Sequence, residues 1–231
     1  MRPLPATAFP RPTRKTKAPF WARSPSAPGG VTKANARGIF ADLTGFGYAA
    51  IARLGDATGI DASIFSSFDD PVLNTDGDLA FLATIKGKTI KGLAATTLWW
   101  QPPGESLELL AQGGGAPAGL PGAQYKAFTS LANADNRGPI FAATLLPGKG
   151  GISRSGASGV WAVDFQGTLH LLFQTGVPDA IVSGKTLKSF TLLNAAVGST
   201  GVTHSFNDGQ QLVWLATFTD KSQAIMTTEI P

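Results

Sequence analysis

The chain has 231 residues, 43% of them apolar and only 15% charged, and its 28 glycines and 16 prolines favour turns over long helices. The absence of cysteine excludes disulfide bonds, thiolate nucleophiles and cysteine-based metal sites. No apolar run approaches the roughly 18 residues that a membrane-spanning helix needs, so we expect no membrane span.

The N-terminal segment differs in composition from the rest of the chain. Residues 1–37 hold eight basic and no acidic side chains, and because the whole chain carries +4, residues 38–231 carry −4. Seven prolines within residues 1–30 remove backbone donors and fix φ, which disfavours helices and central strands. We therefore predict a basic, Pro-rich disordered tail over 1–37 and a β-repeat domain over 38–231. The tail could bind nucleic acid or anionic lipid through its charge, or simply be solvated.

Three sequence anchors recur in a fixed order along the domain. The first is an apolar pair that ends in Phe, the second is a turn of Asn, Asp and Gly followed by an apolar strand, and the third is an aromatic residue 13 positions before a polar one. The apolar pair ends at Phe68, Phe128 and Phe190. The strand that follows the turn covers 79–84, 140–144 and 212–217, and the aromatic residue before the polar one is Phe40, Trp99 and Trp161. Matching intervals between three anchors indicate an internal repeat.

Each repeat of roughly 60 residues is predicted to hold four antiparallel strands. In one complete repeat we expect them at 64–72, 78–85, 96–101 and 106–112, followed by a Gly/Pro-rich connection at 113–123. Four short antiparallel strands per repeat are typical of a β-propeller blade, which buries both faces against its neighbours. The predicted fold is therefore all-β and propeller-like, with about three blades, fewer than closed rings use. We expect an open arc, a fragment of a longer protein, or a ring completed by homo-oligomerisation.

One turn carries a recognisable signature. Asn74-Thr-Asp-Gly77-Asp-Leu-Ala80-Phe81 matches Asn-x-x-Gly-x-x-Ala-Phe at every fixed position, and looser copies begin at Asn136 and Asn207. Over residues 38–230 the chain resembles the bacterial tandem-repeat proteins named for that signature. The resemblance implies a propeller-like protein that is exported or surface-anchored and has no established activity. Residues 1–30 lack an apolar stretch long enough for a signal peptide, so we expect none there.

The candidates for chemistry are few. His170 occupies the repeat position that Glu108 fills in the preceding copy, which predicts a solvent-facing side chain. His204 lies in an inserted loop with no second histidine nearby. An EF-hand loop has Asp at its first position, Gly at its sixth and Glu at its twelfth. If Gly77 is the sixth position of the acidic loop 69–78, the first is Val72 and the twelfth is Ala83, so the loop is not an EF-hand. We therefore predict no catalytic residue, no metal site and no cofactor.

The tryptophans are assigned by their repeat positions. Trp99, Trp161 and Trp214 share anchors with Phe, which predicts core packing. Trp100 follows Trp99 directly, so it points to the opposite face of the strand and is expected to be the most exposed aromatic. It is therefore a candidate for stacking on a ligand.

The pattern favours a non-catalytic binding or structural module that presents loops to an unidentified partner. The alternative is a hydrolase or lyase with a composite site formed by acids from loops of different blades. The loops after the second and fourth strands of each repeat are expected on one cationic face, which suits an anionic ligand or protein, although such charges can simply keep loops soluble. The candidate ligand-binding residues of that face are Lys86, Lys88, Lys91, Lys149 and Arg154, with Trp100 as a further candidate.

Overall fold

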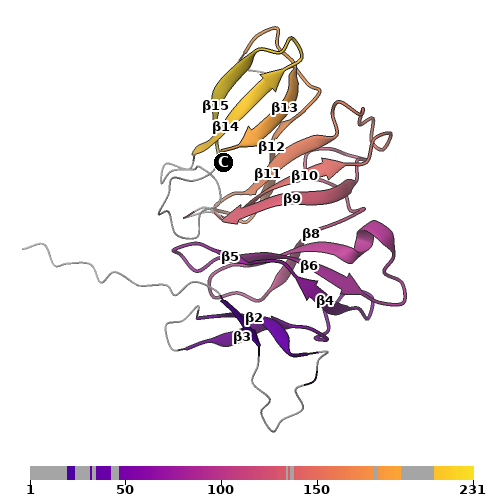
Figure 1. The fold of residues 1–231 in the computed structure, drawn as a ribbon, viewed down its shortest axis with the longest axis vertical. Coiled ribbons are helices and arrows are strands. Elements are labelled where there is room, and N and C mark those ends of the chain that lie inside the picture. Colours follow the sequence, from indigo (N-terminus) through magenta and orange to yellow (C-terminus); the bar gives the residue numbers. More distant parts are fainter. Residues whose placement is uncertain are drawn as a thin grey trace, which may run out of the picture.

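The computed structural model describes the backbone of residues 20–23 and all of residues 32, 35–42, 47–133, 135, 138–178, 182–193 and 211–231. These residues form antiparallel β-sheets and one short 3₁₀ helix, so the expected all-β class is confirmed (Figure 1). The first sheet contains β1 (Phe20–Arg23), β2 (Arg37–Ala41) and β3 (Ala49–Arg53). The second contains β4 (Ile64–Phe68), β5 (Val72–Leu73), β6 (Leu79–Lys86), β7 (Thr96–Gln101) and β8 (Glu108–Gln112), with η1 (Gly92–Ala95) between β6 and β7. The third contains β9 (Tyr125–Asn133), β10 (Pro139–Leu145), β11 (Ser158–Val163) and β12 (Leu169–Gln174), and the fourth β13 (Leu187–Leu192), β14 (Gln211–Phe218) and β15 (Gln223–Glu229).

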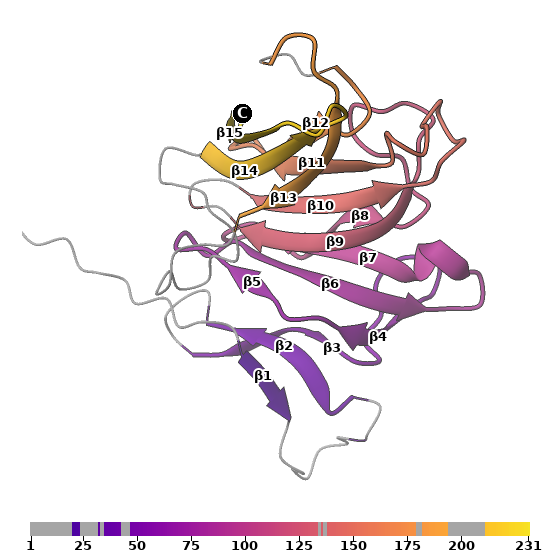
Figure 2. The same cartoon turned by 45° about the horizontal axis from the view of Figure 1, so that its top comes forward.

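Within each sheet the strands follow chain order as successive hairpins. The orders are β1-β2-β3, β4-β6-β7-β8, β9-β10-β11-β12 and β13-β14-β15, with the short β5 also paired to β6. Figures 1 and 2 show the four sheets stacked face to face in the order of the sequence. The predicted strand at 96–101 has those bounds in the structure, whereas the one predicted at 64–72 is interrupted between β4 and β5.

Apolar side chains fill the three spaces between consecutive sheets. One core cluster joins Ile39 of the first sheet to Phe81 of the second. Another joins Leu98 of the second sheet to Phe141 of the third, and a further one joins Val160 of the third to the fourth sheet. Side chains alternate between the two faces of a strand, so the second and third sheets are apolar on both faces and each face is covered by a neighbour. The cores therefore lie between the sheets.

The second and third sheets carry matching sets of aromatic rings. The ring centroids of Phe65 and Trp99 are 5.1 Å apart, and those of Tyr125 and Trp161 are 5.2 Å apart. In the second sheet the ring centroids of Phe65 and Phe68 are 5.2 Å apart, and those of Phe68 and Phe81 are 5.7 Å apart. In the third sheet the corresponding distances are 5.3 Å for Tyr125 and Phe128 and 5.7 Å for Phe128 and Phe141. The sets are Phe65, Phe68, Phe81 and Trp99, and Tyr125, Phe128, Phe141 and Trp161. Tilted rings at these separations add to the stabilisation from buried area.

The β-structure begins earlier than the sequence predicted. Strand β1 lies within the segment 1–37 that was expected to be a tail, and it pairs antiparallel with β2, which itself starts at Arg37. A domain boundary at residue 38 is therefore placed too late. The reason is that β1 is an edge strand of four residues, too short to give a periodic pattern and flanked by Pro19 and Pro25.

The predicted exposure of Trp100 is wrong. Trp99 and Trp100 do take opposite faces, because Trp99 joins the cluster shared with the first sheet and Trp100 packs with Val163 of the third. Trp100 is nevertheless only 6% exposed. The alternation of a strand separates its two faces but does not tell whether the second one is covered, and here the third sheet covers it.

These burials predict the cost of removing each tryptophan. Trp161→Ala and Trp100→Ala should each lower the free energy of unfolding by about 3–5 kcal/mol, since both remove a buried ring. Leu109, which is 36% exposed on β8, supplies the control, and Leu109→Ala should cost less than about 1 kcal/mol. Urea denaturation followed by circular dichroism measures all three. A cost for Trp100→Ala as small as that for Leu109→Ala would contradict the burial of Trp100.

Candidate functional site

The hairpin loops at the two ends of the strands differ in charge. Antiparallel strands alternate in direction, so the connections between them alternate between two ends of the sheets. The loops after β2, β4, β7, β9 and β11 emerge at one end, and the loops after β3, β6, β8, β10, β12 and β14 emerge at the other. At the first end, the described loop residues include eight acids and no base: Asp42, Asp69, Asp70, Asp76, Asp78, Glu105, Asp135 and Asp164. At the second end they include Lys88, Lys91, Lys149, Arg154, Lys185 and Lys221, with Asp56, Asp61 and Asp220. We call these the acidic end and the basic end.

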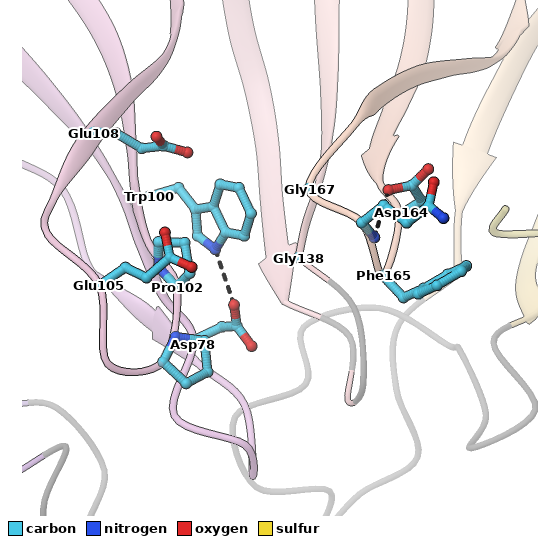
Figure 3. Close-up of a pocket in the computed structure, with 11 residues that line it drawn as sticks. Asp78, Trp100, Pro102, Glu105, Glu108, Gly138, Asp164, Phe165 and Gly167 are labelled. Carbon is cyan, nitrogen blue, oxygen red and sulfur yellow. Dashed lines mark hydrogen bonds between the residues drawn. The ribbon is translucent and has the colours of Figure 1, made fainter.

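A pocket of ≈480 Å³ opens at the acidic end between the second and third sheets. Figure 3 shows Glu105 and Glu108 on one side of it, Asp164 and Phe165 on the other, and the Trp100 ring between them. We call it the acidic pocket. Its lining consists of Asp78, Trp100, Pro102, Pro103, Glu105, Glu108, Gly138, Asp164, Phe165, Gln166 and Gly167.

Asp78 is fixed by the turn that precedes β6. The Asn74 side-chain oxygen accepts the Asp78 N–H at 2.8 Å, and Gly77 completes the turn at φ +96°. One carboxylate oxygen of Asp78 accepts the Asn74 amide at 3.0 Å, and the other accepts the Trp100 indole N–H at 3.0 Å. Burial raises the pKa of Asp78 above its ordinary value, although both hydrogen bonds act to lower it. Asp78 therefore holds Trp100 in place as a wall of the pocket.

Asp164 is fixed by the turn between β11 and β12. One of its oxygens accepts the backbone N–H groups of Gln166 and Thr168, each at 2.8 Å. The other oxygen lies 2.8 Å from Nε2 of His170, whose side chain is 38% exposed. Burial acts to raise the pKa of Asp164, but the hydrogen bonds from Thr168, His170 and Gln166 outweigh it and hold the pKa below its ordinary value.

Two carboxylates of the acidic pocket remain available. The side chains of Glu105 and Glu108 are exposed, and within the described residues neither side chain makes a hydrogen bond or an ion pair. Glu108 lies opposite Trp100 in the β7–β8 register. The pocket thus combines two structural carboxylates, two unengaged carboxylates and an indole wall.

Gly138 permits the close approach of the two sheets behind the acidic pocket. A Cβ atom at this position would lie 2.7 Å from the Val163 side chain and 3.1 Å from the Trp100 ring. Any larger residue would therefore push the third sheet away from Trp100 or displace the ring.

The sequence-predicted cationic residues lie at the basic end, opposite the acidic pocket. Lys86, Lys88 and Lys91 belong to the end of β6 and the connection after it, and Lys149 and Arg154 belong to the β10–β11 connection. All five side chains are exposed. Trp100, which was grouped with them as a candidate, lies in the acidic pocket, so the structure separates it from the cations.

Of the predicted cations, Arg154 lines a space of ≈530 Å³ between the third and fourth sheets. Lys188 of β13 lines it too, and in the described part of the chain neither cation makes an ion pair. We call it the cationic cavity. Its lining consists of Thr129, Ala143, Thr144, Arg154, Ser155, Ser158, Thr175, Lys188, Ser189 and Phe190.

Sequence reasoning missed Glu105, Glu108, Asp164 and Phe165 as pocket residues. They come from hairpins of different sheets, and only the packing of one sheet on the next brings these hairpins together. One signal was available, because acids gather in the loops after first and third strands while cations gather in the others. The inserted loop at 195–205, with His204, lies outside the described residues.

Among the described residues, no group of three or more His, Cys, Asp or Glu side chains is arranged to hold a metal ion. In the same residues no helix is both long and apolar enough to cross a membrane.

The fold and the pocket define a class: an all-β protein of stacked antiparallel sheets with an acidic pocket between two of them. Residues 20–230 match the model of a family of unknown function (DUF7453), and the chain belongs to that family. The match begins at the first residue of β1, in agreement with the structure. Comparisons with curated proteins and with solved structures give no match.

The environment of Asp164 predicts a pH dependence of stability. Its pKa in the folded protein lies below the ordinary 3.8, so its charge stabilises the fold above pH 3.8 and this stabilisation is lost as the pH falls through the folded value. Asp164→Asn keeps an oxygen for the turn but removes the charge. The unfolding free energy of the wild type should exceed that of the variant near neutral pH, and the gap should close between about pH 5 and about pH 2. Urea denaturation across this range tests it, and a constant gap would contradict the assignment.

Proposed function

We propose that the protein is a non-catalytic binding module whose sheets are propeller-like blades and whose end loops recognise a charged partner. The observation that carries the proposal is the acidic pocket, in which the carboxylates with shifted pKa values are engaged in the fold and the unengaged ones face solvent. A surface of this kind offers recognition without an activated group.

Two features support the propeller-like arrangement. The sheets stack face to face in chain order, and the second and third carry ring sets with the same spacing. The three-stranded first and fourth sheets would then be incomplete blades of an arc. The residues of the Asn-x-x-Gly-x-x-Ala-Phe signature also have physical roles, since Asn74 and Gly77 form the turn and Ala80 and Phe81 are fully buried. Under the resemblance to that repeat family, an exported or surface location is part of the proposal.

The alternative, a hydrolase or lyase with a composite site, draws its support from the same pocket, because its acids come from two sheets. Asp78 and Asp164 have pKa values shifted in opposite directions, as a general acid and a general base would. However, both oxygens of each carboxylate already have partners. The Asp78 oxygens accept hydrogen bonds from Asn74 and Trp100, and the Asp164 oxygens bind a backbone N–H and the His170 ring. Neither is placed to exchange a proton with a substrate, which favours binding over catalysis.

The partner that suits the acidic pocket is a basic peptide segment. Glu105 and Glu108 can accept from Lys or Arg side chains, and the exposed Phe165 can cover the aliphatic part of such a side chain. The remaining acids of this end extend the negative field beyond the pocket.

Binding of fluorescein-labelled hexalysine, followed by anisotropy at low salt, tests this assignment. The double variant Glu105→Gln/Glu108→Gln should bind about five- to tenfold more weakly than the wild type, and the loss should shrink as salt is added. The pair Asp61→Asn/Glu229→Gln makes the same change in net charge away from the pocket and serves as the control. Equal weakening in both double variants would show only a net-charge effect and would refute the site.

A second candidate partner is anionic and uses the basic end. The cationic cavity favours it, because Arg154 and Lys188 are surrounded there by the hydroxyl groups of several Ser and Thr side chains. A carboxylate or sulfate group bound there would have cations and hydroxyl donors around it.

Fluorescein-labelled hexaglutamate is the matching probe for the basic end. Lys88→Glu/Lys149→Glu and Arg154→Gln/Lys188→Gln should each weaken its binding several-fold at low salt. The Glu105→Gln/Glu108→Gln protein should retain binding, since it changes only the acidic end. Hexaglutamate binding that is untouched by both cation variants would contradict this second candidate.

A further inference from the structure

In the described part of the chain, the fourth sheet lacks a strand that the second and third sheets have. The second sheet ends on β8 and the third on β12, and each of these strands pairs with the strand before it. The fourth sheet ends on β15, and among the described strands none pairs with its outer edge. The outer edge of β15 therefore corresponds to the edges of β7 and β11 that a fourth strand covers.

The strand register shows that Met226 of β15 occupies the position of Trp161 in β11. Trp161 lies opposite Phe141 of the strand before it, and Met226 lies opposite Trp214 in the same way. Both Trp161 and Met226 are buried on the face that packs toward the preceding sheet. A fourth strand beside β15 would therefore lie next to Met226 as β12 lies next to Trp161.

The side chains of β12 show what such a strand packs against. Leu169 and Leu171 of β12 belong to the core cluster between the second and third sheets, together with residues of β8, β10, β11 and the β8–β9 connection. A Cβ atom on Gly119 of that connection would lie 3.2 Å from Cβ of Leu171, so this leucine covers the connection. One sheet later, the matching elements β12, β14, β15 and the β12–β13 connection enclose a pocket of ≈330 Å³. We call it the edge pocket.

The walls of the edge pocket are largely apolar. They include Met226 and the rings of Phe173 and Trp214, which are stacked with their centroids 4.0 Å apart. Val177, which also lines the pocket, is 41% exposed. The Trp214 indole N–H already donates to the Thr228 hydroxyl at 2.9 Å, so this polar group of the wall needs no further partner. An apolar side chain therefore suits the pocket better than a polar one.

The backbone of β15 offers hydrogen-bonding groups beside the edge pocket. The Phe218 N–H donates to the Ser222 carbonyl at 2.9 Å where β14 turns into β15, and this bond sets the alternation along the two strands. Every second residue of β15 then bonds to β14. The residues between them, which include Ile225 and Thr227, turn their N–H and C=O groups outward.

We propose that the outer edge of β15 and the edge pocket bind an extended, apolar segment of another protein as a fourth strand. The main chain of the segment bonds to the outward groups of β15, and alternate large side chains enter the pocket. The occupant is inferred from β12, which fills the corresponding place one sheet earlier with six extended residues and presents Leu169 and Leu171 to it. Because these contacts need no charge, the site is distinct from the acidic pocket and the cationic cavity.

A peptide with the sequence of residues 167–176, which contains no Lys, Arg, Asp or Glu, is the probe. Labelled with a neutral dye and followed by anisotropy, it should bind the protein with an affinity that changes less than about twofold with salt. The peptide with Leu169→Asn and Leu171→Asn should bind at least about tenfold more weakly, since two buried leucines are lost. The His170→Asn peptide changes the opposite face of the strand and should bind like the parent peptide.

A variant of the protein tests the pocket itself. Val177→Asp places a charge at an exposed position of the edge pocket and should weaken binding of the parent peptide about tenfold. Leu109→Asp makes the same kind of change at an exposed apolar position on β8 and is the matched control. Thermal melts establish that both variants are folded. Equal weakening in the two variants would contradict binding at the edge pocket.

Hydrogen exchange followed by NMR distinguishes strand addition from occupation of the pocket alone. The peptide should slow exchange of the outward amides of Ile225 and Thr227, whereas those of Ala224 and Met226 should already exchange slowly in the free protein. Peptide binding without this new protection would overturn the proposal, as would a lack of peptide binding. Protection of the Ile225 and Thr227 amides that rises with the concentration of the protein alone would also overturn it, because a second copy would then occupy the edge.

Discussion

The structure depends on one constraint: its second and third sheets are apolar on both faces, and neither face of these two sheets can be left in water. A sheet with one apolar face could stop at a single partner, but these sheets must be covered twice, and stacking in chain order covers them with the shortest connections. Large rings fill the spaces between sheets: Trp161 packs against Leu98 and Ala111 of the preceding sheet, and Trp214 stacks on Phe173. Each interface is local in sequence, so stability is expected to accumulate sheet by sheet.

Stacking leaves the hairpin loops as the part of each sheet that is free to carry function. The strands alternate in direction, so the loops collect at two ends, and these ends carry opposite charge. A pocket forms where the loops of neighbouring sheets diverge, and its walls therefore come from different hairpins. This explains why Glu105 and Asp164, far apart in the chain, line the same space. Recognition by such a surface is set by loop composition and is independent of the packing that holds the sheets together.

Local rules predicted much of the fold from the sequence. Asn, Asp and Gly mark turns because they accept the required backbone angles, and alternation placed Trp99 and Trp100 on opposite faces. The predictions that failed required knowledge of the neighbouring sheet. The burial of Trp100 depends on the third sheet, and the acidic pocket depends on the fit of Gly138 beside that ring. Strand β1 was missed because an edge strand of four residues is defined by its pairing more than by its own pattern.

Asp78 connects a local turn to the packing of one sheet on the next. The turn from Asn74 to Asp78 starts β6, and the same Asp78 carboxylate reaches across to the Trp100 indole on β7. Its backbone carbonyl accepts the Asn133 side chain of β9 at 2.6 Å, so this one residue also ties the second sheet to the third. A buried carboxylate costs desolvation, and here the hydrogen bonds from Asn74 and Trp100 offset part of that cost. The turn that specifies the hairpin therefore also sets the separation of the sheets at the acidic end, and with it the shape of the pocket.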